Sequence, residues 1–176
     1  GGSNNGSGGT IVSTTGTGVA LNTVVDINLA YMNINNSGDD GINGTDVTNF
    51  TLNRSNLNNN GNSTSDEGIQ FGAPSGAIPA LFGTVSITNT AVSGSAHNNI
   101  WVRQATGTLA SFTVSNSSFN NLVDATGANS FLFETANSAV VTSATISNIT
   151  VNNNSPQPGF DALAHDSSTM TIVLHN

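Results

Sequence analysis

A short pattern of apolar residues and asparagine recurs along this chain and constrains its fold more than any other feature. Each copy has an apolar anchor residue, a second apolar residue five positions later, and Asn or Gly seven positions later. Self-similarity of this kind is typical of repeat proteins, in which each repeat is one supersecondary unit. Five segments fit the pattern and a sixth begins at the end of the chain; their anchors are Leu29, Leu52, Ile87, Val114, Ile146 and Leu174.

The anchors and the residues two positions before them follow the period-2 alternation of a β-strand. A residue of the apolar or small class lies two positions before every anchor, and period-2 alternation places both residues on one face of a strand. Each segment is therefore predicted to be a strand with one face inward, followed by a bend. The residues that precede the anchors are Ile27, Phe50, Val85, Phe112, Ala144 and Ile172.

The position two residues after the anchor is predicted to form an asparagine ladder. Asparagine tolerates a left-handed backbone at a bend, and stacked asparagines can hydrogen-bond along a column. Tyr31 and Arg54 occupy this position in the first two copies, so the ladder is incomplete there. Its predicted members are Asn89, Asn116, Asn148 and Asn176.

Two further strands are predicted in each repeat. A second strand core follows every anchor, and its first apolar residues are predicted to be Ile42, Ile69, Ile100, Phe131 and Leu163. The third strand is the least regular. It is placed at residues Thr45–Thr48, Ala80–Thr84, Gly107–Ser111 and Val140–Ser143.

The repeat length indicates the architecture. The anchors are on average 29 residues apart, which is the length that three short strands and three turns consume. No repeat buries its apolar residues alone, but stacking at the strand spacing of about 4.8 Å would place equivalent residues above one another. The prediction is an all-β parallel solenoid of about six coils with three short strands per coil, formed by residues 10–176 as one domain after a flexible Gly/Ser/Asn-rich lead-in at residues 1–9.

Composition excludes several classes of function. The chain has only two Lys or Arg residues and a formal net charge of −8, so the electrostatic footprint of nucleic-acid binding is missing. It has no cysteine, which excludes disulfides and thiolate metal sites. No apolar run approaches the roughly 20 residues of a membrane span. Neither nucleic-acid binding nor membrane insertion is expected.

With these repeats, the chain resembles right-handed parallel β-helix proteins of the pectate-lyase-like kind, in particular the Asn/Ser/Thr/Gly-rich repeats of large bacterial secreted and surface proteins. The resemblance covers about residues 16–176. It implies a right-handed β-helix and an extracellular or cell-surface location, but no activity, because this scaffold hosts many functions.

Acidic residues gather just before the second strand. In adjacent coils Asp39, Asp40, Asp66 and Glu67 are expected within reach of one another. Asp40 and Glu67 share a repeat position with Asn98, Asn129 and Asp161, and Asp39 and Asp66 lie one residue earlier, with His97. Three interpretations stay open. The side chains can cap turns, bind calcium, the candidate cofactor, through oxygen ligands, or supply a carboxylate pair for glycoside hydrolysis.

A second candidate site lies on the following strand. Trp101 comes one residue after the inward Ile100, so alternation points its indole outward, where it can stack on a sugar ring. Arg103, two residues later, is one of the two Lys or Arg residues in the chain. Both are candidate ligand-binding residues for a glycan.

Two functional hypotheses follow. The first is a non-catalytic structural or adhesive module, in which the last strand, through Ile172 and Leu174, associates end to end with further coils or with another copy. The neutral polar surface and the absence of lysine suit a rod exposed to extracellular proteases. The second is a carbohydrate-binding or polysaccharide-degrading β-helix domain that uses the acidic edge and Trp101.

Overall fold

The chain folds into β-strands joined by turns. The computed structural model describes residues 8–124, 127–152 and 156–175, and in them it contains sixteen strands and no helix. The strands form two sheets in which every pairing is parallel. The predicted all-β class with parallel strands is confirmed.

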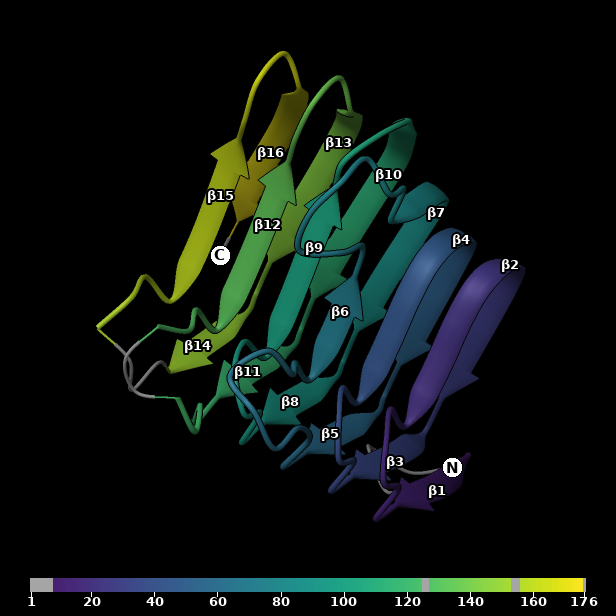
Figure 1. The fold of residues 1–176 in the computed structure, drawn as a ribbon, viewed down its shortest axis with the longest axis vertical. Helices are drawn as coiled ribbons and strands as arrows, with labels where there is room; N and C mark the ends of the chain where they lie inside the picture. The colour runs from purple at the N-terminus through teal and green to yellow at the C-terminus, as the bar shows by residue number, and fades with distance from the viewer. Residues whose placement is uncertain (1–7, 125–126, 153–155, 176) are drawn as a thin grey trace.

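The smaller sheet takes one short strand from each repeat. Each of its strands pairs with the strand one repeat later, so the order in the sheet is the order in the chain (Figure 1). The six strands are β1 (Gly9–Val12), β3 (Met32–Asn35), β5 (Asn56–Asn58), β8 (Ala91–Ser93), β11 (Ser118–Asn120) and β14 (Thr150–Asn152).

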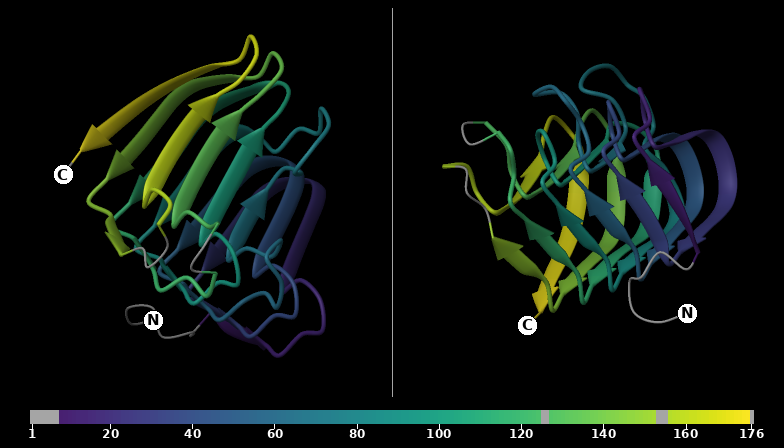
Figure 2. Two further views of the ribbon diagram at one scale, coloured as in Figure 1. Left: turned by 60° about the vertical axis from the view of Figure 1, so that its left-hand side comes forward. Right: turned by 90° about the horizontal axis from the view of Figure 1, so that it is seen from below.

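The larger sheet has ten strands and divides at β4 (Ile42–Asn53). The first residues of β4 pair with β6 and its remaining residues pair with β7, so two rows of strands extend from it (Figures 1 and 2). One row is β6 (Ile69–Phe71), β9 (Ile100–Gln104), β12 (Phe131–Thr135) and β15 (Phe160–Ala164). The other is β7 (Leu81–Thr88), β10 (Thr108–Ser115), β13 (Val140–Ser147) and β16 (Thr169–His175), while β2 (Val19–Ala30) pairs with β4.

The strand register follows the repeat found in the sequence. Leu29 pairs with Leu52, and the later anchors Ile87, Val114, Ile146 and Leu174 continue the same column. The second apolar residues form another column in the six-stranded sheet, composed of Ile34, Leu57, Val92, Phe119 and Val151. The predicted alignment of both positions is confirmed.

One predicted alignment is wrong. Phe131 pairs with Phe160, whereas Leu163 pairs with Glu134. The rings of Phe131 and Phe160 meet at a centroid distance of 5.0 Å in an edge-to-face arrangement, which lets the larger aromatic side chain continue the inward column. As a consequence Asp161 lies beside Leu132 and not in the acidic column.

The predicted third strand is not a separate element in any of the described repeats, so the prediction of three short strands per coil is wrong in this respect. In the first two repeats the second, third and anchor segments form one continuous strand of twelve residues, β2 and β4. In later repeats the third segment merges with the anchor strand. Within β4 the chain bends at Asp46 and Asn49, which have φ values of 54° and 57°, and short polar side chains tolerate this left-handed conformation.

The last two residues of the predicted lead-in, Gly8 and Gly9, are part of the folded structure. Gly9 is the first residue of β1, and the Gly8 amide donates to the carbonyl of Tyr31 at 2.8 Å. Residues 1–7 lie outside the described part of the chain.

The core is a set of stacked apolar columns between the sheets. Phe112 is fully buried, and its ring contacts Phe133 at 4.7 Å and Phe131 at 6.3 Å between centroids. Phe119 contacts Phe131 at 5.4 Å, which ties the six-stranded sheet to the larger one. The three strands of this repeat therefore depend on the aromatic side chains that pack between them, and the contact of Phe131 with Phe160 links the repeat to the next one.

Truncating Phe112 tests this dependence. Phe112→Ala should lower the free energy of unfolding by about 3–5 kcal/mol, because it removes a buried ring and leaves a cavity beside the rings of Phe131 and Phe133. Urea denaturation measures the loss. Thr113→Ala, on the adjacent outward position, is the matched control and should change stability by less than about 0.5 kcal/mol. Similar values for the two variants would contradict the assigned strand faces.

Candidate functional site

The acidic residues of the second-strand turn lie in a buried polar column. Asp40 and Glu67 are 2% and 0% exposed, and Asn98 and Asn129 occupy the equivalent positions of the next repeats. One oxygen of Asp40 accepts a hydrogen bond from the Glu67 amide at 2.6 Å, and Asn98 Oδ1 accepts from the Asn129 amide at 2.7 Å. A side-chain oxygen thus links each of these repeats to the backbone of the next.

Glu67 has a different set of partners. Its Oε1 meets His97 Nδ1 at 2.8 Å and accepts from Asn98 Nδ2 at 3.2 Å. Its Oε2 is buried and has no hydrogen-bond partner among the described residues. Asn43 donates to the second oxygen of Asp40. Among the described residues, no arginine or lysine forms an ion pair with Asp40 or Glu67.

Burial shifts the protonation of these groups. Desolvation raises the pKa of Asp40 to about 7, and the nearby carboxylates of Glu67 and Asp39 add to that rise. Desolvation also raises the pKa of Glu67, although hydrogen bonds from His97 and Asn98 oppose it. The hydrogen bond to Glu67 raises the pKa of His97. All three groups hold protons more tightly in the folded chain than their ordinary pKa values imply.

The other two predicted metal ligands have separate partners. Asp39 accepts from the Thr17 hydroxyl at 2.9 Å. Asp66 accepts from the amides of Asn62 and Ser63, both at 2.9 Å, and from hydroxyls of the same loop. Partial burial raises the pKa of Asp66, but these hydrogen bonds outweigh it and lower the pKa overall. Asp66 is thereby held within its own loop, and Asp39 is bonded to a hydroxyl of the preceding repeat.

The structure brings together only part of the predicted calcium site. Asp40 and Glu67 are neighbours, while the carboxylates of Asp39 and Asp66 are held by turn hydroxyls and amides. Within the described residues, no group of three or more His, Asp or Glu side chains is arranged to hold a metal ion. Calcium binding stays a prediction.

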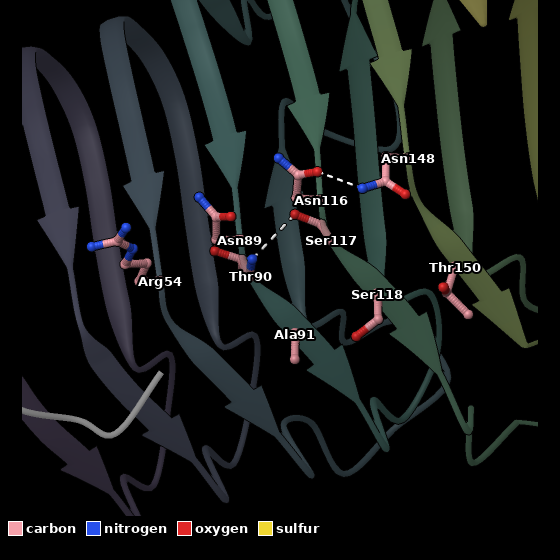
Figure 3. A pocket seen from close by; sticks show the side chains of 9 residues that line it. All are labelled: Arg54, Asn89, Thr90, Ala91, Asn116, Ser117, Ser118, Asn148 and Thr150. Carbon is pink, nitrogen blue, oxygen red and sulfur yellow. Dashed lines mark hydrogen bonds between the residues drawn. The ribbon is translucent and has the colours of Figure 1, made fainter. Parts of the chain in front are cut away.

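The predicted asparagine ladder lies at the bend between the two sheets (Figure 3). Asn89, Asn116 and Asn148 have φ values of 52°, 50° and 47°. Asn148 Nδ2 donates to Asn116 Oδ1 at 2.5 Å, whereas Asn89 Nδ2 donates to Asn53 Oδ1 at 3.1 Å. Asn176 lies outside the described residues.

A column of buried hydroxyls beside this ladder was missed in the sequence. Ser55, Thr90 and Ser117 follow the left-handed residues and are at most 5% exposed. The Ser55 hydroxyl accepts from the Met32 amide at 3.1 Å, and the Ser117 hydroxyl accepts from the Thr90 amide at the same distance. The signal was present, because each of these residues lies three positions after its anchor.

An open groove of about 590 Å³ runs along the same bend. Its walls combine amide and hydroxyl side chains from three successive repeats with one guanidinium from the repeat before them, and no carboxylate (Figure 3). The lining residues are Arg54, Asn89, Thr90, Ala91, Asn116, Ser117, Ser118, Asn148 and Thr150.

Trp101 lies on the outward side of β9, as predicted, and Arg103 lies on the same side. Trp101 is partly buried, and its indole nitrogen is buried without a hydrogen-bond partner among the described residues. Arg103 donates to the carbonyls of Ala73 and Gly76 at 3.2 and 3.0 Å, and its Nε lies 3.8 Å from Glu134. The guanidinium thus holds the loop after β6.

Ile172 and Leu174 lie on β16, which pairs only with β13 in the described part of the chain. Ile172 is partly buried against the core, and Leu174 is 60% exposed. The inward apolar columns therefore reach the solvent at this edge.

The comparisons give no relative from which a function can be transferred. No family model, curated protein or solved structure matches this chain. Among the described residues there is no helix with the length and apolarity needed to cross a bilayer.

The buried carboxyl groups predict an inverse dependence of stability on pH. A carboxyl whose pKa is raised on folding stabilises the native state below its unfolded pKa, and that contribution is lost as the pH rises through the folded value. His97 acts in the same direction. The melting temperature should therefore decrease as the pH rises from about 4.5 to 8. Differential scanning calorimetry measures this change.

The matched variant is Asp40→Asn, because Asn98 already performs the same role with an amide. The variant should be more stable than the parent at pH 8. Its free energy of unfolding should depend less steeply on pH than that of the parent. The two slopes should differ by up to about 1.4 kcal/mol per pH unit, which corresponds to one titrating proton. Identical pH profiles for parent and variant would show that Asp40 does not titrate in this range.

Calcium binding has its own test. If Asp39, Asp40, Asp66 and Glu67 hold the ion, adding calcium should raise the melting temperature, because the ion binds the native state alone, and a chelator should reverse the rise. Magnesium at the same concentration is the control. A melting temperature unchanged over millimolar calcium would leave these residues with the turn-capping role.

Proposed function

We propose that the chain is a non-catalytic structural or adhesive module of the extracellular space or cell surface, built as a right-handed parallel β-helix of about six coils. In this proposal the coils continue by stacking end to end, so that the module is part of a longer solenoid or filament. The observation that carries it is the parallel pairing of each repeat with the next, in which the anchor residues stay aligned from Leu29 to Leu174.

The edge strands support stacking. In the described part of the chain β1 and β2 each pair on one side only, and so do β14, β15 and β16 at the opposite end. An edge strand offers a row of amides and carbonyls that template a further strand. Because all pairings are parallel, the two ends are complementary and not identical, and a contact between them is head to tail.

The apolar columns support the same conclusion. In the middle repeats the inward residues are fully buried, whereas Ile27 and Leu29 at one end, and Ile172 and Leu174 at the other, are partly or largely exposed. A further repeat on either end would bury them as the middle repeats are buried. At about 25 cal/mol per Å² of apolar surface, such burial favours association.

The burial of the acidic pair supports a non-catalytic role. A general acid or nucleophile must reach its substrate, and the Asp40 and Glu67 side chains are buried within turn hydrogen bonds. The extracellular location rests on the resemblance to secreted repeat proteins and on the absence of lysine, which leaves few cleavage sites for trypsin-like proteases.

A charge on the terminal strand should block stacking. Leu174→Asp places a carboxylate on the exposed end of the apolar column, where burial against another copy would desolvate it. We expect the parent chain to form larger assemblies with rising concentration, measured by light scattering and negative-stain microscopy. The variant should stay monomeric, with a melting temperature close to that of the parent. Ile172→Asp should give the same block with a larger loss of stability.

His175→Asp is the control. It adds the same charge one residue later, on the outward face of the same strand, and should leave assembly intact. A parent chain that stays monomeric at all concentrations, or assemblies that Leu174→Asp does not reduce, would contradict end-to-end association.

A further inference from the structure

The outer surface of the six-stranded sheet carries no charge. In an acidic chain with ten Asp and Glu residues, none of β1, β3, β5, β8, β11 and β14 contains an acidic, basic or histidine residue. Their inward residues form the Ile34–Leu57–Val92–Phe119 column. The outward residues on either side of it are chiefly Asn, Ser and Thr.

Two grooves lie on this uncharged face and along the bend at its edge, and they share Ala91. One is the groove of about 590 Å³ along the asparagine ladder, and the other, of about 350 Å³, is lined mainly by asparagines of β3 and β5. Ala91 lines both grooves. It stands in register with Asn56 and Ser118, so its short side chain leaves a hollow between two polar neighbours.

The groove side chains form a regular array of hydrogen-bonding groups. Asn89, Asn116 and Asn148 offer amides at the bend, and Ser118 and Thr150 offer hydroxyls on the sheet. Together the two grooves reach from β3 to β14. Four strand spacings of about 4.8 Å make this about 19 Å, which is long enough for several sugar rings in a row.

Arg54 adds a positioned donor at one side of the array. Its Nη1 donates to the Tyr31 hydroxyl at 2.6 Å, and the guanidinium lies 5.7 Å from the centroid of that ring. No carboxylate of the described residues forms an ion pair with it, in contrast to Arg103. Its remaining N–H groups are therefore available to a ligand in the groove.

We propose that this face is a binding site for a neutral polysaccharide, which lies across the strands in the two grooves with its hydroxyls on the asparagine, serine and threonine side chains. Amides and hydroxyls both donate and accept hydrogen bonds, as sugar hydroxyls do. The site is on the side of the stacked repeats, so the proposal is independent of the end-to-end association.

The charge distribution favours a neutral ligand over an acidic one. With a net charge of −8, the chain repels polyanions at long range, and Arg54 is a single cation at one side of the groove. A second copy of the chain is a poorer fit, because protein interfaces are enriched in aromatic residues and methionine at their centre. The outward residues here are small and polar, with a hollow at Ala91.

The experiment is an NMR titration of the full chain with xylohexaose, cellohexaose and mannohexaose, and with hexagalacturonate as the acidic arm. Because no aromatic ring lines the grooves, we expect millimolar affinity for at least one neutral oligosaccharide. Shifts should concentrate on the side-chain amides of Asn89, Asn116 and Asn56. Binding should not change with added salt, because it does not rest on charge.

Ala91→Trp should fill the hollow and weaken binding by at least about tenfold. Ser86→Trp is the matched control, since it places the same side chain on an outward position of β7 in the same repeat and should leave affinity unchanged. A smaller substitution, Ala91→Leu, serves if the tryptophan variant does not fold. Arg54→Gln should weaken binding less than Ala91→Trp, because an amide keeps a donor at that position.

Several results would overturn the proposal. They are an absence of shifts with all neutral oligosaccharides, shifts confined to other faces, or affinity that Ala91→Trp leaves unchanged. Salt-sensitive binding of hexagalacturonate that is tighter than that of the neutral sugars would assign the grooves to acidic glycans. Loss of a dimer in Ala91→Trp, with no sugar bound by the parent, would assign the face to a second copy.

Discussion

No repeat of this chain buries its own apolar side chains, so every part of the structure depends on the parallel register between neighbouring repeats. Each repeat contributes one residue to each inward column, such as Leu57 between Ile34 and Val92. The same register aligns the backbone N–H and C=O groups that form hydrogen bonds between adjacent strands. A shift of one residue would turn the inward side chains outward, and this is why the anchors keep their alignment through turns of different length.

The turns must satisfy backbone groups that the sheets leave unpaired, and polar columns perform that task. Ser55 and Ser117 accept amides of the preceding repeat, and Asp40 and Asn98 accept amides of the following one. A buried unpaired amide would cost about 1–3 kcal/mol, so these side chains are structural. Where the column contains carboxylic acids in place of amides, burial raises the pKa of Asp40 to about 7, and the stability of the fold becomes coupled to pH.

The ends and the sides of the stack offer different surfaces. The ends present edge strands and partly exposed apolar columns, which favour contact with another parallel repeat. The six-stranded side presents uncharged amides and hydroxyls around the hollow at Ala91. A protein built in this way can extend along its axis without covering the face on which we place polysaccharide binding, and the two proposed roles are compatible in one molecule.

The repeat by itself determined the class of fold, the anchor residues and their alignment, because period-2 alternation is a local property of strands and survives insertion in the turns. It did not determine which residue of Phe160-Asp-Ala-Leu163 continues the Phe131 column. The spacing of 13 or 17 residues from the anchor in the other repeats favours Leu163, whereas packing against the Phe131 ring places Phe160 there. The positions of the four carboxylates in the sequence predicted one site. In the tertiary structure Asp39 and Asp66 instead accept hydrogen bonds from different groups, and Asp40 is buried beside Glu67. Side-chain direction in turns and the pairing of distant charges arise only when the repeats stack. For the same reason only the tertiary structure shows the uncharged outer face of the six-stranded sheet and the Arg54 guanidinium beside it, which forms no ion pair with the described residues.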